Sequence, residues 1–123
     1  MTKATYKLVL LLRRRPGMSV KDFRDYYETR HRLIGEKFSD GVVRYVRRYL
    51  DPAPQAIGAA AELPFDVITE VWFDDKAIYD QVLAATATGN LPDEVIADEE
   101  RLFDRPKSRV ACVTEVESTL WNP

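Results

Sequence analysis

Cysteine and histidine are almost absent from this sequence, with one of each in 123 residues. A single Cys112 excludes an intramolecular disulfide, and its apolar neighbours indicate packing inside a strand in a reducing compartment. One histidine among scattered carboxylates gives none of the clustered ligand spacings that zinc or iron sites have, so we expect no metal. A glycine-rich loop of the kind that cradles phosphate is also missing.

Long apolar runs are missing as well. The longest is Leu8 to Leu12, far short of the ~20 residues that a bilayer-spanning helix needs. The N-terminus lacks the apolar stretch of a signal peptide. We therefore expect a soluble cytoplasmic protein without a membrane partner. Its length and 46% hydrophobic composition predict one domain over residues 1–123.

Charge is unevenly distributed along the chain. Residues 1–50 carry 13 Lys and Arg against 5 Asp and Glu, whereas residues 51–123 carry 5 against 15. The basic half suggests phosphate contacts, but a pI near 5.4 and the acidic half oppose nucleic-acid binding. Two explanations of the uneven charge remain. The two halves of the chain neutralise each other within the fold or across a dimer, or the arginines line the rim of a pocket for an anionic ligand. The sequence does not separate these possibilities.

The order of the expected elements predicts an α+β fold of the ferredoxin-like βαββαβ type. Apolar and alternating runs predict strands at residues 6–13, 42–50, 65–73 and 109–117. Capping residues predict helices at about 19–40, 75–88 and 93–102, with a loop at 52–64. This order gives a four-stranded antiparallel sheet, near whose edge the second strand lies, with the helices on one face.

The single histidine, His31, lies on the apolar stripe of the first expected helix. The residues of this stripe recur at steps of three and four: Val20, Phe23, Tyr27, His31, Ile34 and Phe38. An imidazole there is suited to proton transfer near neutral pH. A structural histidine with hydrogen-bonded ring nitrogens gives the same pattern, because buried polar groups normally have partners. The stripe alone leaves both interpretations open.

The third expected strand has a polar face formed by Ile68, Glu70 and Trp72. A polar-lined cavity explains a carboxylate beside a tryptophan, and an open face with Glu70 paired to an arginine of the next strand is the alternative. Because the helices cover only the other face, we expect two sheets to dimerise face to face around a cavity. An apolar tail at Trp121 is available to close the partner's edge.

Three segments resemble the EthD family, small members of the dimeric α+β barrel superfamily. They are the opening LLRRRPGMS at residues 11–19 with FRDYY at 23–27 and Arg30-His31, the strand at 65–73, and the acidic segment at 98–104. Together they cover most of the chain. The resemblance implies a homodimeric α+β barrel whose central cavities bind small organic molecules.

The resemblance also implies an activity. Relatives catalyse dehydration, decarboxylation or cyclisation of aromatic and polyketide compounds without a cofactor, which predicts a cofactor-independent lyase or isomerase acting on a small hydrophobic or aromatic ligand. In that function His31 transfers the proton, and Asp104 or Glu70 orients the imidazole or acts as a second acid–base group. The expected substrate contacts are hydrogen bonds from Tyr27, Tyr45 or Tyr49 and stacking on Trp72.

Two other functions are compatible with the same residues. The protein would be a non-catalytic binder or accessory protein of a degradation pathway if the pocket only holds its ligand. It would be a haem-dependent oxygenase, as some related dimeric barrels are, if His31 is an axial ligand.

Overall fold

The computed structural model describes residues 5–52 and 62–121. Its strands are β1 (Tyr6–Leu12), β2 (Val42–Tyr49), β3 (Val67–Phe73) and β4 (Arg109–Cys112). Its helical segments are α1 (Val20–Tyr26), the π-helical turn η1 (Tyr27–His31), α2 (Arg32–Lys37), α3 (Lys76–Thr88), α4 (Asp93–Leu102) and the 3-10 turn η2 (Arg105–Lys107). Most of the loop predicted at 52–64 lies outside the described residues. No helix in the described ranges has the length and apolar character to cross a membrane.

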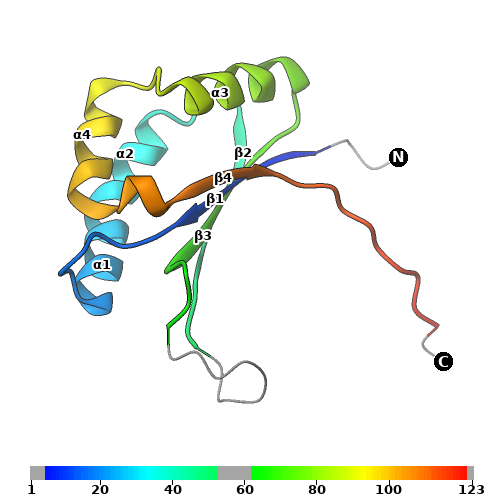
Figure 1. Ribbon diagram of the computed structural model, residues 1–123. Helices are drawn as coiled ribbons and strands as arrows, with labels where there is room; N and C mark the ends of the chain where they lie inside the picture. Colours follow the sequence, from blue (N-terminus) through cyan, green and yellow to red (C-terminus); the bar gives the residue numbers. More distant parts are fainter. Residues whose placement is uncertain (1–4, 53–61, 122–123) are drawn as a thin grey trace.

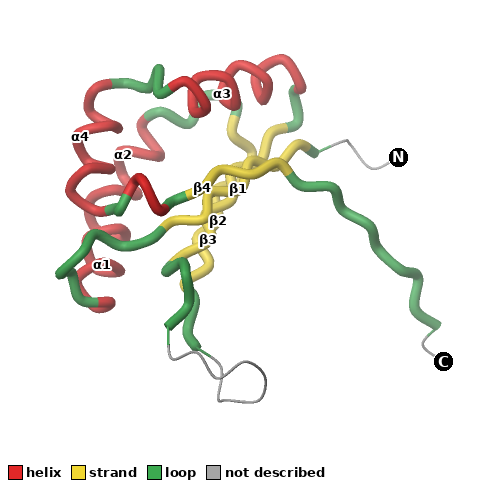
Figure 2. The backbone as a smooth tube through the Cα atoms, viewed as in Figure 1, coloured by secondary structure: helices red, strands yellow, loops and turns green. Residues whose placement is uncertain are grey.

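The four strands form one antiparallel sheet in the order β2-β3-β1-β4. The central pair runs in register from Tyr6 opposite Phe73 to Leu12 opposite Val67. Figures 1 and 2 show the helices gathered on one side of the sheet and the other side left uncovered. The ferredoxin-like prediction is confirmed, including the edge position of β2.

Local capping signals place the starts of α1 and α3 and the end of α3 where the sequence predicts them, whereas the first helix ends at Lys37 and not at about residue 40. The Ser19 hydroxyl accepts a hydrogen bond from the Asp22 N–H at 3.0 Å, and the Asp75 carboxylate accepts one from the Ala77 N–H at 2.9 Å. Gly89 ends α3 with a φ of 71°, a left-handed conformation that costs glycine little.

The hydrophobic core lies between the helix layer and the sheet. Phe23 of α1, Val67 of β3 and Leu102 of α4 are fully buried there, together with Phe103 at 5% exposure. The rings of Phe23 and Phe103 meet edge to face at a centroid distance of 5.9 Å. Burial of a side chain of this size contributes about 1.5–3 kcal/mol, so these residues anchor the helices to the sheet.

The first helix contains a π-helical turn that the sequence did not predict. The N–H of Arg32 donates to the carbonyl of Tyr27, five residues earlier, and the α-helix resumes at Arg32. Tyr27 and His31, the two ends of this turn, are both buried as the apolar stripe predicts. A π-turn adds a residue to one turn of helix and is often found at functional sites.

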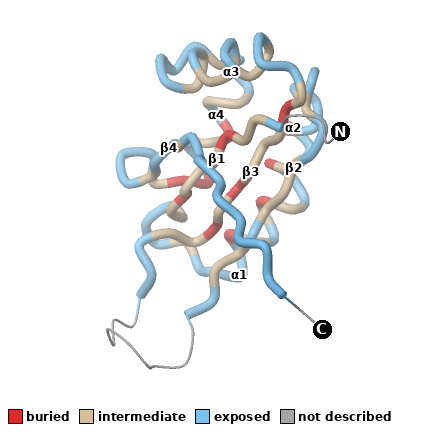
Figure 3. Tube along the Cα trace, turned by 90° about the vertical axis from the view of Figure 1, so that its right-hand side faces the viewer, coloured by how far each residue is buried: buried red, intermediate tan, exposed pale blue. Residues whose placement is uncertain are grey.

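The last strand is shorter than predicted. β4 ends at Cys112 instead of Glu117, and Cys112 is exposed, so its predicted packing inside a strand is wrong. Residues 113–121 extend away from the sheet without a strand partner among the described residues (Figures 1 and 3). Val116, Leu120 and Trp121 are more than 80% exposed in this segment. The alternation that predicted a strand therefore has no neighbouring strand to pair with in a single chain.

Candidate active site

A cavity of about 300 Å³ lies between the helix layer and the helix-facing side of the sheet. Its apolar wall includes Leu8, Leu10, Leu12, Val71, Phe73, Val82, Leu91, Val95 and Phe103. The polar and charged groups on its wall are Tyr27, His31, Ser39, Asp40, Tyr45, Thr69, Thr86, Glu99, Arg105, Ser108 and Arg109. A mostly apolar cavity with a few polar groups is typical of a small-molecule site.

His31 is bound in this wall by Asp98 of α4. Its Nδ1 atom lies 2.7 Å from Asp98 Oδ2, and the Asp98 side chain is only 3% exposed. The hydroxyl of Tyr26 donates to the other carboxylate oxygen at 2.6 Å. The imidazole also packs edge-on against the rings of Tyr27 and Phe103, each at a centroid distance of 5.1 Å. These contacts fix the orientation of the ring.

The partner of Nδ1 determines which nitrogen of His31 is free. An ionised carboxylate only accepts hydrogen bonds, so Asp98 selects the tautomer with the proton on Nδ1. Nε2 then carries a lone pair, and it makes no hydrogen bond within residues 5–52 and 62–121. Burial lowers the pKa of His31 below its ordinary value, against the opposing effect of Asp98. His31 is therefore neutral at neutral pH, as a general base must be.

Tyrosine hydroxyls line the same cavity. The Tyr45 hydroxyl donates to the Tyr27 oxygen at 3.2 Å, and Tyr27 Oη lies 2.7 Å from Thr69 Oγ1. Burial raises the pKa of Tyr27 well above its ordinary value and raises that of Tyr45 as well. Both phenols therefore remain protonated and are suited to hydrogen-bond an oxygen atom of a ligand.

Comparison with known proteins identifies the family. The model of the EthD domain matches residues 15–106, most of the chain. The chain belongs to the EthD family. A crystal structure of an EthD family protein from Bacillus halodurans matches with a TM-score of 0.61 and 17% sequence identity, over 92% of this chain and 100% of that chain. No curated protein matches.

A second solved structure has the same fold. It is the solution structure of a hypothetical protein from Arabidopsis thaliana, which is 17% identical over 96% of this chain and 94% of that chain, with a TM-score of 0.57. At this level of identity both structures show that the EthD domain shares their fold, and they do not extend to its chemistry.

Three of the predicted site residues meet in the EthD cavity: Tyr27, His31 and Tyr45. Tyr49 is directed elsewhere, because its hydroxyl donates to Glu28 Oε2 at 2.5 Å. The same carboxylate accepts hydrogen bonds from Arg47, which lowers the pKa of Glu28. Tyr49 therefore stabilises the contact between η1 and β2 and does not line the cavity.

Glu70 and Trp72 lie on the opposite face of the sheet. Thr69, Val71 and Phe73 line the cavity, so alternation along β3 directs Glu70 and Trp72 away from it. The guanidinium of Arg48 donates to Glu70 at 2.6 Å and lowers its pKa, and the indole N–H of Trp72 donates to Glu70 at 3.0 Å. The arrangement is that of an open face on which Glu70 pairs with an arginine of the neighbouring strand.

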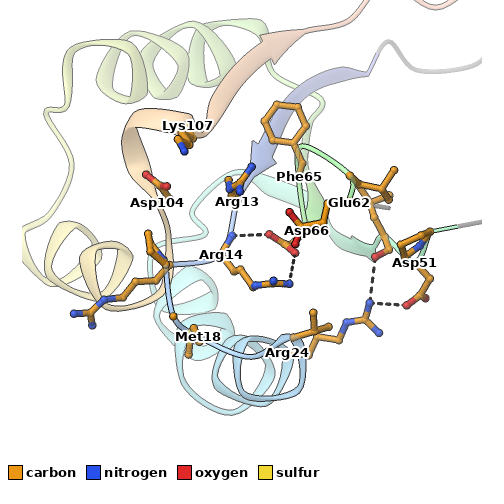
Figure 4. Close-up of a pocket in the computed structure, with 17 residues that line it drawn as sticks. Arg13, Arg14, Met18, Arg24, Asp51, Glu62, Phe65, Asp66, Asp104 and Lys107 are labelled. Atoms are coloured by element: carbon orange, nitrogen blue, oxygen red, sulfur yellow. Dashed lines mark hydrogen bonds and ion pairs between the residues drawn. The ribbon is translucent and has the colours of Figure 1, made fainter. Parts of the chain in front are cut away.

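Asp104 lies in a different pocket of about 590 Å³ (Figure 4). This pocket is lined by paired charges, including Arg14 with Asp66 at 3.1 Å and Arg24 with Asp51 at 2.8 Å. The backbone N–H of Asp104 donates to the carbonyl of Arg13 at 2.8 Å. Asp104 and His31 line different pockets, and Nδ1 of His31 is bound by Asp98, so Asp104 is not the group that orients the imidazole.

The sequence prediction missed Asp98, Glu99 and Thr69. Asp98 belongs to a long acidic stretch in which charge alone does not distinguish one carboxylate from another. Helical spacing is the signal that distinguishes it, because Asp98 lies three residues after Val95 and four before the buried Leu102. That spacing places a carboxylate on the buried side of α4, where burial requires a partner.

Proposed function

We propose that this EthD domain is a cofactor-independent enzyme of the lyase or isomerase type that moves a proton on a small hydrophobic or aromatic compound. The observation that carries the proposal is His31 on the wall of an apolar cavity, with the buried Asp98 bound to its Nδ1 atom. A carboxylate that fixes a neutral imidazole with one free nitrogen is the arrangement that general-base catalysis requires.

Each group contributes a separate step to the proposed reaction. Nε2 of His31 takes the proton, and the Asp98 carboxylate then stabilises the imidazolium that forms. The hydroxyls of Tyr27 and Tyr45 bind an ionisable hydroxyl oxygen of the substrate. The leucines and valines of the wall exclude water, which strengthens these polar interactions.

We also propose that the protein acts as a homodimer that pairs the uncovered sheet faces. Val9, Leu11 and Ile68 alternate with cavity-lining residues, so they form an apolar centre on a face without helices. The extended segment 113–121, with Leu120 and Trp121 exposed, supports a contact with the second copy. Such a contact would bury side chains that are unfavourable in water.

The test of the enzymatic function compares the parent protein with His31→Gln. Phenolic acids, quinones and polyketide-like lactones are screened for turnover by chromatography and mass spectrometry. For any compound converted by the parent, His31→Gln is expected to reduce turnover by about 10²–10⁴-fold, because glutamine hydrogen-bonds but does not titrate. The melting temperature of the variant controls for loss of packing.

Two results of this screen contradict the proposal. A His31→Gln protein as active as the parent across about pH 5 to 8 would exclude His31 as the base. Compounds that bind in the cavity and are released unchanged, with none converted, would make the protein a non-catalytic carrier.

A further inference from the structure

Glu99 is an acid on the wall of the His31 cavity that the proposed mechanism does not use. It follows Asp98 in α4 and lines the same cavity as His31 and Tyr45. Its Oε1 atom is fully buried, and neither carboxyl oxygen has a hydrogen-bond partner in the described part of the chain. Buried polar groups nearly always have partners in native proteins, so an unpartnered carboxyl in a cavity indicates a contact that a ligand supplies.

The surroundings of Glu99 favour its neutral form. Burial raises the pKa of this carboxyl, the positive charge of Arg105 opposes the shift, and the negative charge of Asp98 adds to it. Arg105 does not act on the pKa of Glu99 alone, because its guanidinium also lies 3.8 Å from the carboxylate of Glu100. The other titratable groups on the cavity wall are Tyr27, His31, Asp40, Tyr45 and Arg109.

We propose that Glu99 is a substrate-binding residue whose protonated carboxyl donates a hydrogen bond to a carbonyl oxygen of the ligand. This inference rests on the proposed function and extends it, because it assigns an acid to the cavity in which His31 is the base. Two titratable groups whose surroundings favour opposite protonation states are the usual arrangement of an acid and a base in one site. The ligand class is then a small apolar carbonyl compound: a ketone, a quinone or a lactone.

The test uses two ligands that differ only at the carbonyl oxygen. Acetophenone has this oxygen, and α-methylstyrene has a methylene group in its place with nearly the same shape. Binding of each to the full-length protein is measured by titration calorimetry at about pH 5 and about pH 8. The parent protein is expected to prefer acetophenone by about tenfold at the lower pH, the size of one hydrogen bond to a buried group. The preference is expected to decrease at the higher pH, because deprotonation of Glu99 removes the hydrogen-bond donor.

Two substitutions separate the hydrogen bond from the shape of the cavity. Glu99→Leu is expected to bind α-methylstyrene as the parent does and to lose the preference for acetophenone. Glu99→Gln, whose amide donates a hydrogen bond at every pH, is expected to keep the preference and to lose its dependence on pH. A preference that persists in Glu99→Leu would assign the hydrogen bond to a tyrosine and overturn the inference. Failure of acetophenone to bind the parent protein would overturn it as well.

His31→Gln distinguishes this inference from the proposed function. The variant is expected to lose turnover and to keep the preference for acetophenone, because the carbonyl contact belongs to Glu99. A preference that is retained while turnover does not depend on His31 would leave Glu99 as a binding residue and reject the enzymatic proposal. Turnover that depends on His31 without a preference for the carbonyl would reject only the role of Glu99.

Discussion

The tautomer of His31 depends on Asp98, a residue 67 positions further along the chain. Asp98→Asn keeps the size of the side chain, but its amide can donate to Nδ1 and thereby move the histidine proton to Nε2. Nε2 would then no longer accept a proton from a substrate. We expect kcat/KM to fall by about 10²–10⁴-fold in this variant.

A matched control for Asp98→Asn is Glu94→Gln, which removes an exposed carboxylate from the same helix. It is expected to keep the parental kcat/KM. Equal activity of Asp98→Asn and the parent would show that the carboxylate does not determine the state of His31. Urea unfolding of both variants tells a catalytic loss from a loss of stability.

The pH dependence of activity follows from the direction of the His31 shift. The base is the neutral imidazole, which is present above its pKa, and burial lowers that pKa. Activity is therefore expected to persist down to a midpoint below about pH 6.5 in a profile of kcat/KM. Any activity left in Asp98→Asn should have a still lower midpoint, because the carboxylate raises the pKa of His31. A midpoint at or above about pH 6.5 in the parent would contradict the buried, neutral histidine.

At the level of elements, Gly41 fixes the connection between α2 and β2. It has a φ of 79°, and a Cβ added there would lie 2.8 Å from the Ile78 side chain of α3. Gly41→Ala therefore combines backbone strain with a clash between layers. We expect it to lower the free energy of unfolding by about 2–4 kcal/mol, measured by urea denaturation.

Gly17→Ala is the control for backbone strain alone. Gly17 has a φ of 82°, but a Cβ added there meets nothing within 4 Å. Its loss of stability should be about 1–2 kcal/mol, the cost of a left-handed alanine. Equal losses in the two variants would show that Ile78 moves aside without cost and that the close approach of α3 to Gly41 has no energetic role.

For the whole molecule, the opposite charges of the two halves of the chain meet within one fold. Arg14 pairs with Asp66, and Arg48 pairs with Glu70, each joining the basic half to the acidic half. The distances are 3.1 and 2.6 Å. Neutralisation inside the chain therefore accounts for part of the charge asymmetry that the sequence left open.

The proposed dimer is tested by a charge on the uncovered sheet face. Leu11→Glu places a carboxylate in the apolar centre of that face, and burial of this charge against a second copy would be strongly unfavourable. The parent protein is expected to have the mass of a dimer in light scattering at micromolar concentration, and the variant that of a monomer. Leu33→Glu is the control, because Leu33 lies on α2 and is already 51% exposed. A monomeric parent, or a dimeric Leu11→Glu variant, would reject pairing through the sheets.

The order of the elements and most of their ends follow from local signals in the sequence. Caps such as Ser19 and Asp75 act on N–H groups two or three residues away, so their effect is visible in the sequence. The same holds for the spacing that buries Tyr27 and His31, because periodicity is a local property. Interactions between residues close in sequence can be predicted without a structure, because both partners lie in one short segment.

Which groups share the site depends on the packing of elements that are far apart in the sequence. Asp98 reaches His31, and Glu99 reaches the cavity that His31 lines, because α4 packs beside η1, and no local pattern encodes that distance. The packing of helices on one face of the sheet likewise places Thr69 in the cavity and Trp72 on the uncovered face. Alternation along β3 shows that the two residues lie on opposite faces, but it does not show which face the helices cover. The extent of β4 depends in the same way on a neighbouring strand, because a strand exists only where another chain segment completes its hydrogen bonds.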